Sequence, residues 1–435
     1  MRRAILALAL SGLAACGGQA PSAGAGPGLA GTGPEVERVV EDWPLPATLP
    51  GSALPDLANV QGRTLLLAWT HSQPGRRHAL QFSSYDVAAA RWQRRPTTIA
   101  VGNSMFVNWA DTPHIMATAD GALWAHWLQK RGDGPYAYDI MLATSRDGGR
   151  WSAPVSPHGD GTATEHGFVS MWPRADGGLG VAWLDGRATA GRAPSHGEGD
   201  ADGHGGGGGP MALRSTAVDA TLRLEPEVEV DASVCDCCQT AAAVTARGPL
   251  LVYRARREGE VRDIHATRLG DGGWSAPAPV HADGWVMPAC PVNGPAVAAA
   301  GEAAVVAWYT EAAGVPEVRA AASVDAGDRF EAPVVIDAGA PVLGRVDVAL
   351  ADGQAWVLWL REEGEGQSLW LSRRSPDLAT EHQRLQVATL AGRGRGTGFP
   401  RMAVAGGVAH VVWTDVADGM PGLRGARVLP RAAGG

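Results

Sequence analysis

The amino-acid sequence predicts an all-β fold, a β-propeller of seven four-stranded blades, and three observations support this prediction. Short apolar stretches that end in an aromatic residue recur seven times. A turn that contains glycine and an earlier apolar stretch precede each of them, which is the pattern of a β-hairpin. In most units two further strand-like stretches follow. The aromatic-ended stretches are residues 65–69, 123–127, 179–183, 250–253, 304–308, 355–359 and 408–413.

The two ends of the repeated region indicate how the ring closes. The last unit ends near residue 427 with only three strand-like stretches, and residues 36–40 form a separate strand-like stretch before the first unit. We therefore expect this N-terminal stretch to complete the last blade, so that residues 35–430 form a single propeller domain. Helical solenoids are excluded because glycine turns interrupt every candidate helical window.

The N-terminus has the features of an export signal. Two arginines precede a short apolar run, and small residues lead to the motif LAAC at residues 13–16. We expect residues 1–15 to be a signal peptide, because the run is shorter than the roughly 20 apolar residues of a transmembrane helix. The motif resembles the lipobox of bacterial lipoproteins. This resemblance implies a lipid on Cys16, a flexible tether over residues 16–34, and a location in the bacterial cell envelope, at the outer membrane.

Composition limits the partners of the chain. The net charge is -8 over 435 residues, without the clustered basic face that nucleic acids require, so no nucleic-acid partner is expected. No later segment is long and apolar enough to span a bilayer. We therefore expect contact with the membrane through the N-terminal lipid only.

Four cysteines follow the lipidation site, and an exported location allows them to form disulfides. Cys235, Cys237 and Cys238 precede the innermost strand of the fourth unit, and Cys290 precedes that of the fifth. These units are neighbours in a propeller, so we expect a disulfide between Cys290 and one of the other three, and no cofactor. The alternative is that these cysteines, with His166 of the next blade, bind a soft metal ion, copper or zinc.

Two turn motifs resemble the Asp box of the sialidase superfamily, Ser-x-Asp-x-Gly-x-x-aromatic. Residues 323–330 (SVDAGDRF) match it in full, and residues 145–151 (SRDGGRW) are one residue shorter. The resemblance implies a turn after the third strand, with the aspartate accepting backbone hydrogen bonds and the aromatic ring packed between blades. Sialidases of this superfamily have six blades and a Phe/Tyr-Arg-Ile-Pro motif. Six blades are therefore the alternative to the seven counted here, and the motif is absent from this sequence.

Further motifs resemble a bacterial subgroup described as sialidase-like: residues 164–168 (TEHGF), 183–187 (WLDGR), 235–238 (CDCC) and 290–295 (CPVNGP). In a propeller, loops that enter the innermost strands and loops after the second strands open on one face. The unusual polar and aromatic residues fall in these loops, which predicts a site for a carbohydrate or another ligand there. The candidate binding residues are Asn108, Trp109, His166, Asp185, Arg187, Asn293 and Asp347.

The resemblance implies an exo-acting glycoside hydrolase for acidic sugars. Three arginines are candidates for holding the sugar carboxylate, because a guanidinium group matches a carboxylate in shape and charge. They are Arg254, Arg345 and Arg401. Asp111 would protonate the leaving oxygen, and Glu165 with Tyr253 or Tyr309 would be the nucleophile pair. The alternative function is a non-catalytic surface propeller that binds a carbohydrate, a protein or a soft metal ion.

Overall fold

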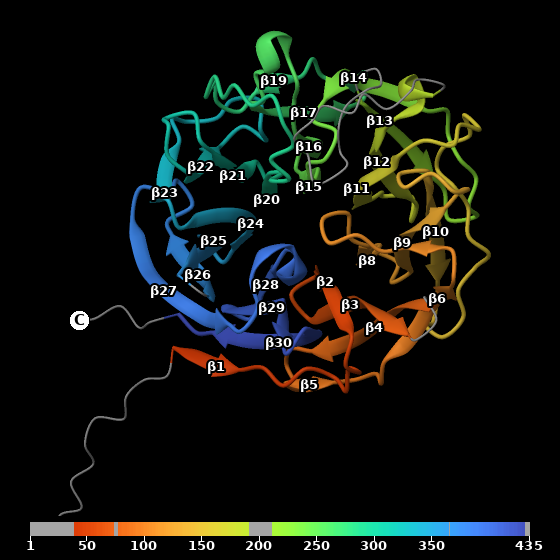
Figure 1. Cartoon of the computed structure of the whole chain (residues 1–435), viewed down its shortest axis with the longest axis horizontal. Coiled ribbons are helices and arrows are strands. Elements are labelled where there is room, and N and C mark those ends of the chain that lie inside the picture. The colour runs from red at the N-terminus through yellow and green to blue at the C-terminus, as the bar shows by residue number, and fades with distance from the viewer. Residues whose placement is uncertain (1–38, 74–76, 191–210, 365, 431–435) are drawn as a thin grey trace, which may run out of the picture. The chain divides into compact units, whose positions relative to one another are not determined.

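Seven antiparallel sheets follow one another around a central axis in the computed structural model, which describes residues 39–73, 77–190, 211–364 and 366–430 (Figure 1). Blade 1 contains β2 (Ser52–Val60), β3 (Thr64–Gln73), β4 (Arg77–Asp86), β5 (Arg91–Trp92) and β6 (Thr97–Gly102). Blade 2 contains β7 (Met105–Phe106), β8 (Ile115–Ala117), β9 (Leu123–Lys130) and β10 (Tyr138–Ser145). Blade 3 contains β11 (His166–Pro173), β12 (Leu179–Asp185), β13 (Met211–Val218) and β14 (Val228–Val234).

The second half of the chain continues the same pattern. Blade 4 contains β15 (Ala241–Thr245), β16 (Gly248–Arg254), β17 (Ile264–Gly270), β18 (Gly273–Trp274) and β19 (Ala278–Pro279). Blade 5 contains β20 (Ala296–Ala300), β21 (Ala303–Thr310), β22 (Glu317–Ser323) and β23 (Val334–Ala338). Blade 6 contains β24 (Val342–Ala351), β25 (Gln354–Glu363), β26 (Gly366–Arg374) and β27 (Glu381–Leu390). Blade 7 contains β28 (Arg401–Ala405), β29 (Val408–Ala417) and β30 (Met420–Val428). The predicted all-β, seven-bladed propeller is therefore confirmed, and the six-bladed alternative is wrong.

The second strand of each blade contains the aromatic-ended stretch found in the sequence. These strands are β3, β9, β12, β16, β21, β25 and β29. Their aromatic residues are Trp69, Trp127, Trp183, Tyr253, Trp308, Trp359 and Trp413, and none is more than 7% exposed. Because aromatic rings bury large areas, they dominate the packing between neighbouring blades.

The N-terminal strand β1 (Val40–Asp42) closes the ring. It pairs with β30 in blade 7, with Val40 opposite Val428. Blade 7 is therefore completed by a strand from the other end of the described chain, as the strand count predicted. The closing strand begins later than the expected stretch 36–40, whose first three residues lie outside the described part.

Three short 3-10 turns are the helical elements of the described residues. They are η1 (Arg187–Thr189), η2 (Glu258–Glu260) and η3 (Gly394–Thr397). Within the described ranges, no helix has the length and apolar character needed to cross a membrane. The predicted signal peptide (1–15), the tether (16–34) and the lipidation site Cys16 lie outside the described residues.

Bulges shape the inner strands β2, β11 and β24. Leu54, Phe168 and Arg345 lie in them with φ of 56°, 52° and 51°, in the left-handed region that residues with a side chain rarely adopt. The bulges turn N–H groups toward the preceding blade. Phe168 N–H donates to Asp111 Oδ1 at 2.9 Å, and Arg345 N–H donates to Asn293 Oδ1 at 2.8 Å. The bulges thus fix polar side chains around the central channel.

Tight turns follow the third strands of blades 2 and 5. Asp147 Oδ1 accepts two backbone N–H groups, both at 2.8 Å, and Asp325 Oδ1 accepts one at 2.9 Å. The Trp151 ring packs edge-on against Phe82 of blade 1, with 5.8 Å between the ring centroids. These turns therefore lock neighbouring blades together.

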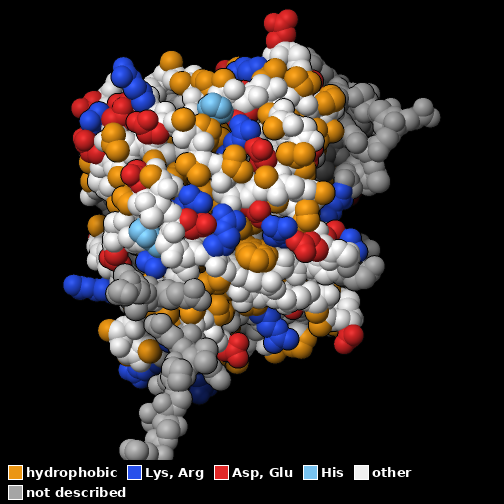
Figure 2. Space-filling view, turned by 90° about the vertical axis from the view of Figure 1, so that its left-hand side faces the viewer, with side chains coloured by type: hydrophobic (Ala, Val, Ile, Leu, Met, Phe, Trp, Pro, Cys, Tyr) orange, Lys and Arg blue, Asp and Glu red, His pale blue; other side chains and the backbone are white. Residues whose placement is uncertain are grey.

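The outer rim of blades 5 and 6 carries basic and acidic side chains that are interspersed over its surface (Figure 2). Ion pairs here include Arg361 Nη1 with Asp337 Oδ2 at 3.0 Å and Arg384 Nη2 with Glu381 Oε1 at 2.9 Å. Pairs of this partly exposed kind contribute little to stability. This rim is a mixed-charge surface. The carboxyl groups with raised pKa values, Asp111 and Glu165, lie nearer the central axis.

Candidate functional site

A tyrosine hydroxyl held between two carboxyl groups lies between blades 2 and 3. Tyr138 Oη is 2.6 Å from Glu165 Oε1 and 3.2 Å from Asp111 Oδ2. Asp111 precedes the inner strand β8, Tyr138 begins β10, and Glu165 precedes the inner strand β11. The group therefore lies on the face where the loops enter the inner strands, as the sequence predicts for Asp111 and Glu165.

Backbone contacts hold this group together. Tyr138 N–H donates to Thr164 O at 3.2 Å, and the backbones of Tyr138 and Glu165 form a parallel β-bridge. Gly167 leaves the space that Asp111 fills, because a Cβ atom on residue 167 would lie 1.9 Å from Asp111 Oδ2. The short segment before β11 thus supplies both the glutamate and the room for its acidic neighbour.

Burial sets the protonation of the group. It raises the pKa of Asp111, which is 2% exposed, to about 7, although hydrogen bonds from Phe168 N–H and Tyr138 oppose this change. Burial, together with the nearby Asp111 carboxyl, also raises the pKa of Glu165 to about 8. The Glu165 side chain is partly exposed, whereas that of Asp111 is buried. Near neutral pH the group therefore retains a proton and can both donate and accept one.

Aromatic and basic side chains surround the group. Trp109 stacks on Phe399 with ring centroids 5.9 Å apart, and Arg395 Cζ lies 5.8 Å from the Trp109 ring. Tyr136 is partly exposed, and burial and the charge of Glu165 raise its pKa. Aromatic faces beside converging polar groups are typical of small-ligand sites.

A cavity of about 240 Å³ opens along the channel and includes Asp56, His114 and Arg401 in its lining. Arg401 Nη2 lies 3.3 Å from the hydroxyl of Thr112, the residue after Asp111. Arg401 Nε is buried without a hydrogen-bond partner and lies 3.9 Å from Asp56 Oδ1. Arg401 is therefore a predicted site arginine that lies in the channel and contacts the residue after Asp111.

A larger groove of about 530 Å³ opens between blades 3 and 4, at the opposite ends of their inner strands. Trp172 and Trp274 pack edge to face in its lining. Its basic residue Arg174 pairs with Asp176 and Glu225, each at 2.9 Å. Here one arginine holds two carboxylates, whereas at the channel mouth Asp111 and Glu165 hold a tyrosine hydroxyl.

The other two predicted arginines are used inside the structure. Arg254 donates to three backbone carbonyl oxygens of blades 4 and 5 at 2.6 to 3.1 Å. Arg345 donates to two carbonyl oxygens and to the Thr397 hydroxyl, each at 3.0 Å. The predicted triad with Arg401 is therefore not assembled, because the three guanidinium groups have three separate sets of partners. Buried carbonyl groups where the blades meet require these donors.

The two tyrosines expected in the nucleophile pair also lie elsewhere. Tyr253 Oη donates to Asp231 Oδ2 at 2.6 Å, and Tyr309 Oη contacts Glu311 Oε1. The tyrosine that meets the glutamate of the site is Tyr138, which the sequence prediction missed. Its position in the sequence could have identified it as the partner of Glu165, because its loop in blade 2 adjoins blade 3. The other two tyrosines belong to blades 4 and 5.

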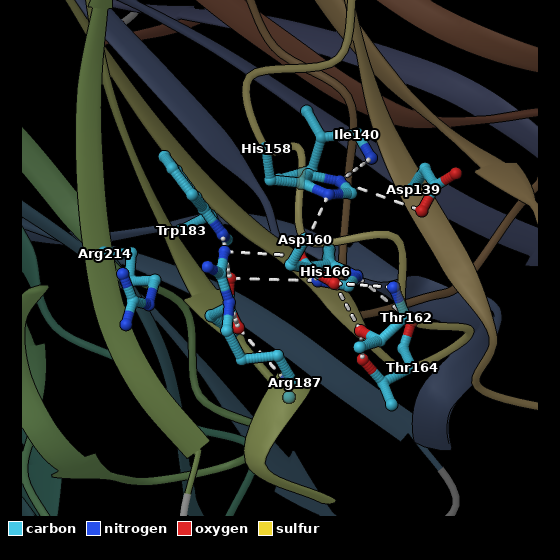
Figure 3. Close-up of polar contacts among 12 residues, drawn as sticks. Asp139, Ile140, His158, Asp160, Thr162, Thr164, His166, Trp183, Arg187 and Arg214 are labelled. Atoms are coloured by element: carbon cyan, nitrogen blue, oxygen red, sulfur yellow. Dashed lines mark hydrogen bonds and ion pairs between the residues drawn. The ribbon is translucent and has the colours of Figure 1, made fainter. Parts of the chain in front are cut away.

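Three predicted binding residues, His166, Asp185 and Arg187, form a largely buried polar network, and Figure 3 shows His166 and Arg187 in it. His166 Nε2 lies 2.9 Å from Asp160 Oδ2, and its ring stacks on His158 with centroids 3.8 Å apart. Arg187 Nη2 lies 2.7 Å from Asp185 Oδ2 and 3.3 Å from Asp160 Oδ2. His166 and Asp185 are fully buried, so these residues support the loops of blade 3 instead of facing a ligand.

The same network has a spacing that suits a metal ion. Single ligand atoms of Asp160, His166 and Asp185 lie within 4.8 Å of one another. However, the Arg187 guanidinium already pairs with both carboxylates and offsets one of their two negative charges. His166 is committed to this network, and the group of possible ligands formed by Cys235, Cys237 and Cys238 does not include it.

The remaining predicted binding residues have different surroundings. Asn108 Oδ1 accepts an N–H of its own loop at 2.8 Å, and Asn293 links blade 5 to the β24 bulge. Asp347 Oδ2 accepts Met402 N–H at 2.7 Å, and burial raises its pKa to about 6. Trp109 is partly exposed beside the acidic group, where it can contact a ligand.

The cysteines form one disulfide, between Cys237 and Cys290. It joins the loops that enter blades 4 and 5 and confirms the expected disulfide of Cys290. Cys235 and Cys238 are buried thiols. Burial opposes ionisation of Cys235, but a hydrogen bond from Cys238 and the charge of Arg262 lower its pKa to about 7. Burial raises the pKa of Cys238. The Cys235 thiol therefore ionises more readily than the Cys238 thiol.

Comparison with known proteins shows the fold. No protein-family model and no curated protein matches this chain. A solved ulvan lyase of polysaccharide lyase family PL25 matches with a TM-score of 0.50 at 12% identity, covering 86% of this chain and 93% of that chain. A protein of unknown function from Dyadobacter fermentans matches with a TM-score of 0.49 at 13% identity, covering 91% and 100%. The GH93 α-L-arabinofuranosidase of Fusarium graminearum matches with a TM-score of 0.45 at 12% identity, covering 75% and 95%.

Proposed function

We propose that this chain is a carbohydrate-active enzyme, a glycoside hydrolase whose reaction centre is Asp111, Tyr138 and Glu165. The observation that supports this proposal is the tyrosine hydroxyl held between two carboxyl groups beside the central channel. Both carboxyl groups contact the tyrosine oxygen, so one can take its proton while the other serves as the acid.

The two carboxyl groups share a proton near neutral pH, and the roles belong to the state in which Asp111 holds it. In that state the ionised Glu165 accepts the phenol proton of Tyr138, and the phenolate attacks the anomeric carbon of the sugar. Asp111 gives its proton to the leaving oxygen as the glycosidic bond breaks. Water then attacks the anomeric carbon and gives a proton to Asp111, the bond between the sugar and the Tyr138 oxygen breaks, and Glu165 returns its proton to that oxygen.

The proposal includes acidic sugars as substrates. The basic groups that support this specificity are Arg401 in the lining of the channel cavity and Arg395, which lies 5.8 Å from the Trp109 ring. A guanidinium attracts a sugar carboxylate more strongly than a neutral hydroxyl. Secretion and lipid attachment at Cys16 are a further part of the proposal and rest on the N-terminal sequence.

A panel of fluorogenic glycosides tests the activity. It should contain sialic acid, uronic acid and neutral sugars, and the full chain should release the fluorophore from an acidic member. We expect Tyr138→Phe to lower kcat by about 10³-fold, because the variant lacks the nucleophile. Tyr253→Phe is the matched control, since its hydroxyl also contacts a carboxylate but lies in blade 4, and it should retain wild-type kcat.

Two results would overturn the proposal. One is an intact Tyr138→Phe activity, and the other is a wild-type chain that binds glycans in the panel without cleaving any. The second result would support the non-catalytic alternative. An unsaturated sugar product, detected by its ultraviolet absorbance, would instead indicate a lyase.

A further inference from the structure

Two buried thiols lie beside the disulfide of blades 4 and 5. Cys235 and Cys238 are 1% and 2% exposed, and two residues separate them in the sequence. The sulfur atoms of Cys235, Cys237 and Cys238 lie within 4.8 Å of one another. Because Cys237 is bonded to Cys290, the sulfurs free to ionise in this group are Cys235 and Cys238.

Two buried guanidinium groups flank this pair. Arg262 is 3% exposed, and its Nη1 lies 3.4 Å from Cys235 Sγ. Arg254 is 2% exposed, and its charge acts on Cys238. Arg262 is paired with Glu260 and Asp236. Among the hydrogen bonds of the described residues, Arg254 has carbonyl partners and no carboxylate.

The positive charge of Arg254 is therefore not matched by an acidic side chain in this part of the structure. A buried charge is costly unless an opposite charge lies close to it. A negative charge carried by the two sulfurs would meet this need. Arg262 Nε is also buried without a hydrogen-bond partner. The same region therefore has fewer hydrogen-bond acceptors than donors.

The surroundings of the thiols are apolar. The cysteines belong to a buried cluster that includes Val234, Tyr253, Ala255 and Phe399. Such surroundings exclude water and favour soft ligands over the oxygen ligands that hard cations need. Two sulfurs also leave a zinc ion short of the four ligands of its usual tetrahedral site.

We infer that Cys235 and Cys238 bind one soft monovalent metal ion, Cu(I), between two thiolates. Binding releases the two thiol protons to solvent, and copper enters and remains as Cu(I), so no electron is exchanged. The complex carries one negative charge, which Arg254 and Arg262 stabilise. The disulfide stays intact and holds the loop that carries the thiols. This site is separate from the acidic group at Tyr138, so its test does not depend on the proposed hydrolase activity.

The probe is Cu(I), supplied without oxygen as its complex with the coloured chelator bicinchoninate. We expect the full wild-type chain to remove one copper ion per chain from the chelator, and Cys235→Ala and Cys238→Ala each to lose this copper. Met211→Leu is the matched control, because Met211 is another buried sulfur residue of the same apolar cluster, and it should keep the copper. Arg262→Met should weaken binding by about 10-fold to 100-fold, as expected for a residue that supports a metal ligand.

X-ray absorption on the wild-type complex keeps the test independent of the folding of the variants. Two sulfur ligands and no nitrogen or oxygen ligand are the expected result. The inference is overturned if the wild type leaves the copper with the chelator, or if Cys235→Ala retains it. A second disulfide between Cys235 and Cys238, found by peptide mapping of the natively purified protein, would also overturn it.

Discussion

Asp111 shows how the fold gives a common side chain an unusual property. The side chain is 2% exposed, and the bulged Phe168 N–H and the Tyr138 hydroxyl are its hydrogen-bond partners. An exposed aspartate would be ionised at neutral pH and could not act as an acid. Burial between two blades makes proton donation possible at this position.

The raised pKa of Asp111 predicts a pH-dependent stability. The folded state holds the Asp111 proton more tightly than the unfolded state, in which the pKa is near 3.8. The contribution of Asp111 to the free energy of unfolding is therefore largest below about pH 4 and is lost as the pH rises from about 4 to about 7. The full effect is about 4 kcal/mol. In Asp111→Asn this titration is absent, so the variant should gain stability relative to wild type between pH 5 and pH 8, measured by urea unfolding.

Asp147→Asn is the control for this experiment. Hydrogen bonds from the backbone N–H groups of Arg150 and Gly149 lower the pKa of the exposed Asp147, so it is ionised in both states above pH 5. Its substitution should change stability by the same amount at pH 5 and pH 8. A similar constant difference for Asp111→Asn would show that Asp111 is not protonated in the folded protein.

At the scale of single elements, side chains of the inner strands tie each blade to the next. Asp56 in β2 accepts Ile115 N–H at 2.8 Å, and the Asp347 contact with β28 has the same form. Between blades 3 and 4, the hydroxyls of Ser170 and Thr240 lie 2.6 Å apart. Such side chains satisfy buried backbone and hydroxyl groups that no sheet hydrogen bond reaches. The channel wall is therefore polar because its blades need these connections.

The disulfide is a covalent connection of the same kind. Cys237 and Cys290 are 53 residues apart in the sequence, and a loop of this length predicts a stabilisation of about 4 kcal/mol in the chain-entropy model. We expect the double variant Cys237→Ala/Cys290→Ala to unfold at a lower guanidinium concentration by this free energy. Wild-type protein in excess dithiothreitol is the control and should approach the variant. Equal midpoints for the variant and the oxidised wild type would show that the disulfide contributes nothing.

At the scale of the whole molecule, the ring is joined where blade 7 meets blade 1. Trp43, directly after β1, is 3% exposed and stacks on Trp92 with centroids 5.2 Å apart. Its ring also meets Tyr85 of blade 1 and His410 of blade 7, at 5.2 and 4.8 Å. One residue near the start of the described chain thus packs against both blades of the closure.

Removal of this ring should destabilise the whole propeller. We expect Trp43→Ala to lower the free energy of unfolding by about 3–5 kcal/mol, as for other buried tryptophans. Hydrogen exchange should become faster in both β30 and β2, because the closure supports both blades. Trp370→Ala, which removes a half-buried ring within blade 6, is the control and should have a smaller effect. Faster exchange confined to β1 would show that the ring does not depend on this contact.

The number of blades was determined by the sequence alone. Each blade repeats a hairpin whose second strand ends in a buried aromatic residue, from Trp69 in blade 1 to Trp413 in blade 7. This pattern is local, because alternating burial and glycine turns act between residues that are close in the sequence. The closure by an N-terminal strand followed from the count, since blade 7 lacked one strand. Asp111 and Glu165 were proposed from their places in loops that enter inner strands and from the resemblance to sialidases.

The tertiary structure alone decided which side chains meet. Glu165 pairs with Tyr138 because the two backbones form a bridge between blades 2 and 3, and no sequence spacing encodes that bridge. Arg254 and Arg345 turn inward because buried carbonyl groups between blades need donors, a requirement that appears only when the blades are packed. Cys290 had three possible partners within four residues, and the loop conformation selected Cys237. Which side chains meet across long sequence distances depends on how the blades pack, to within a few ångströms. Local sequence patterns do not specify positions that finely.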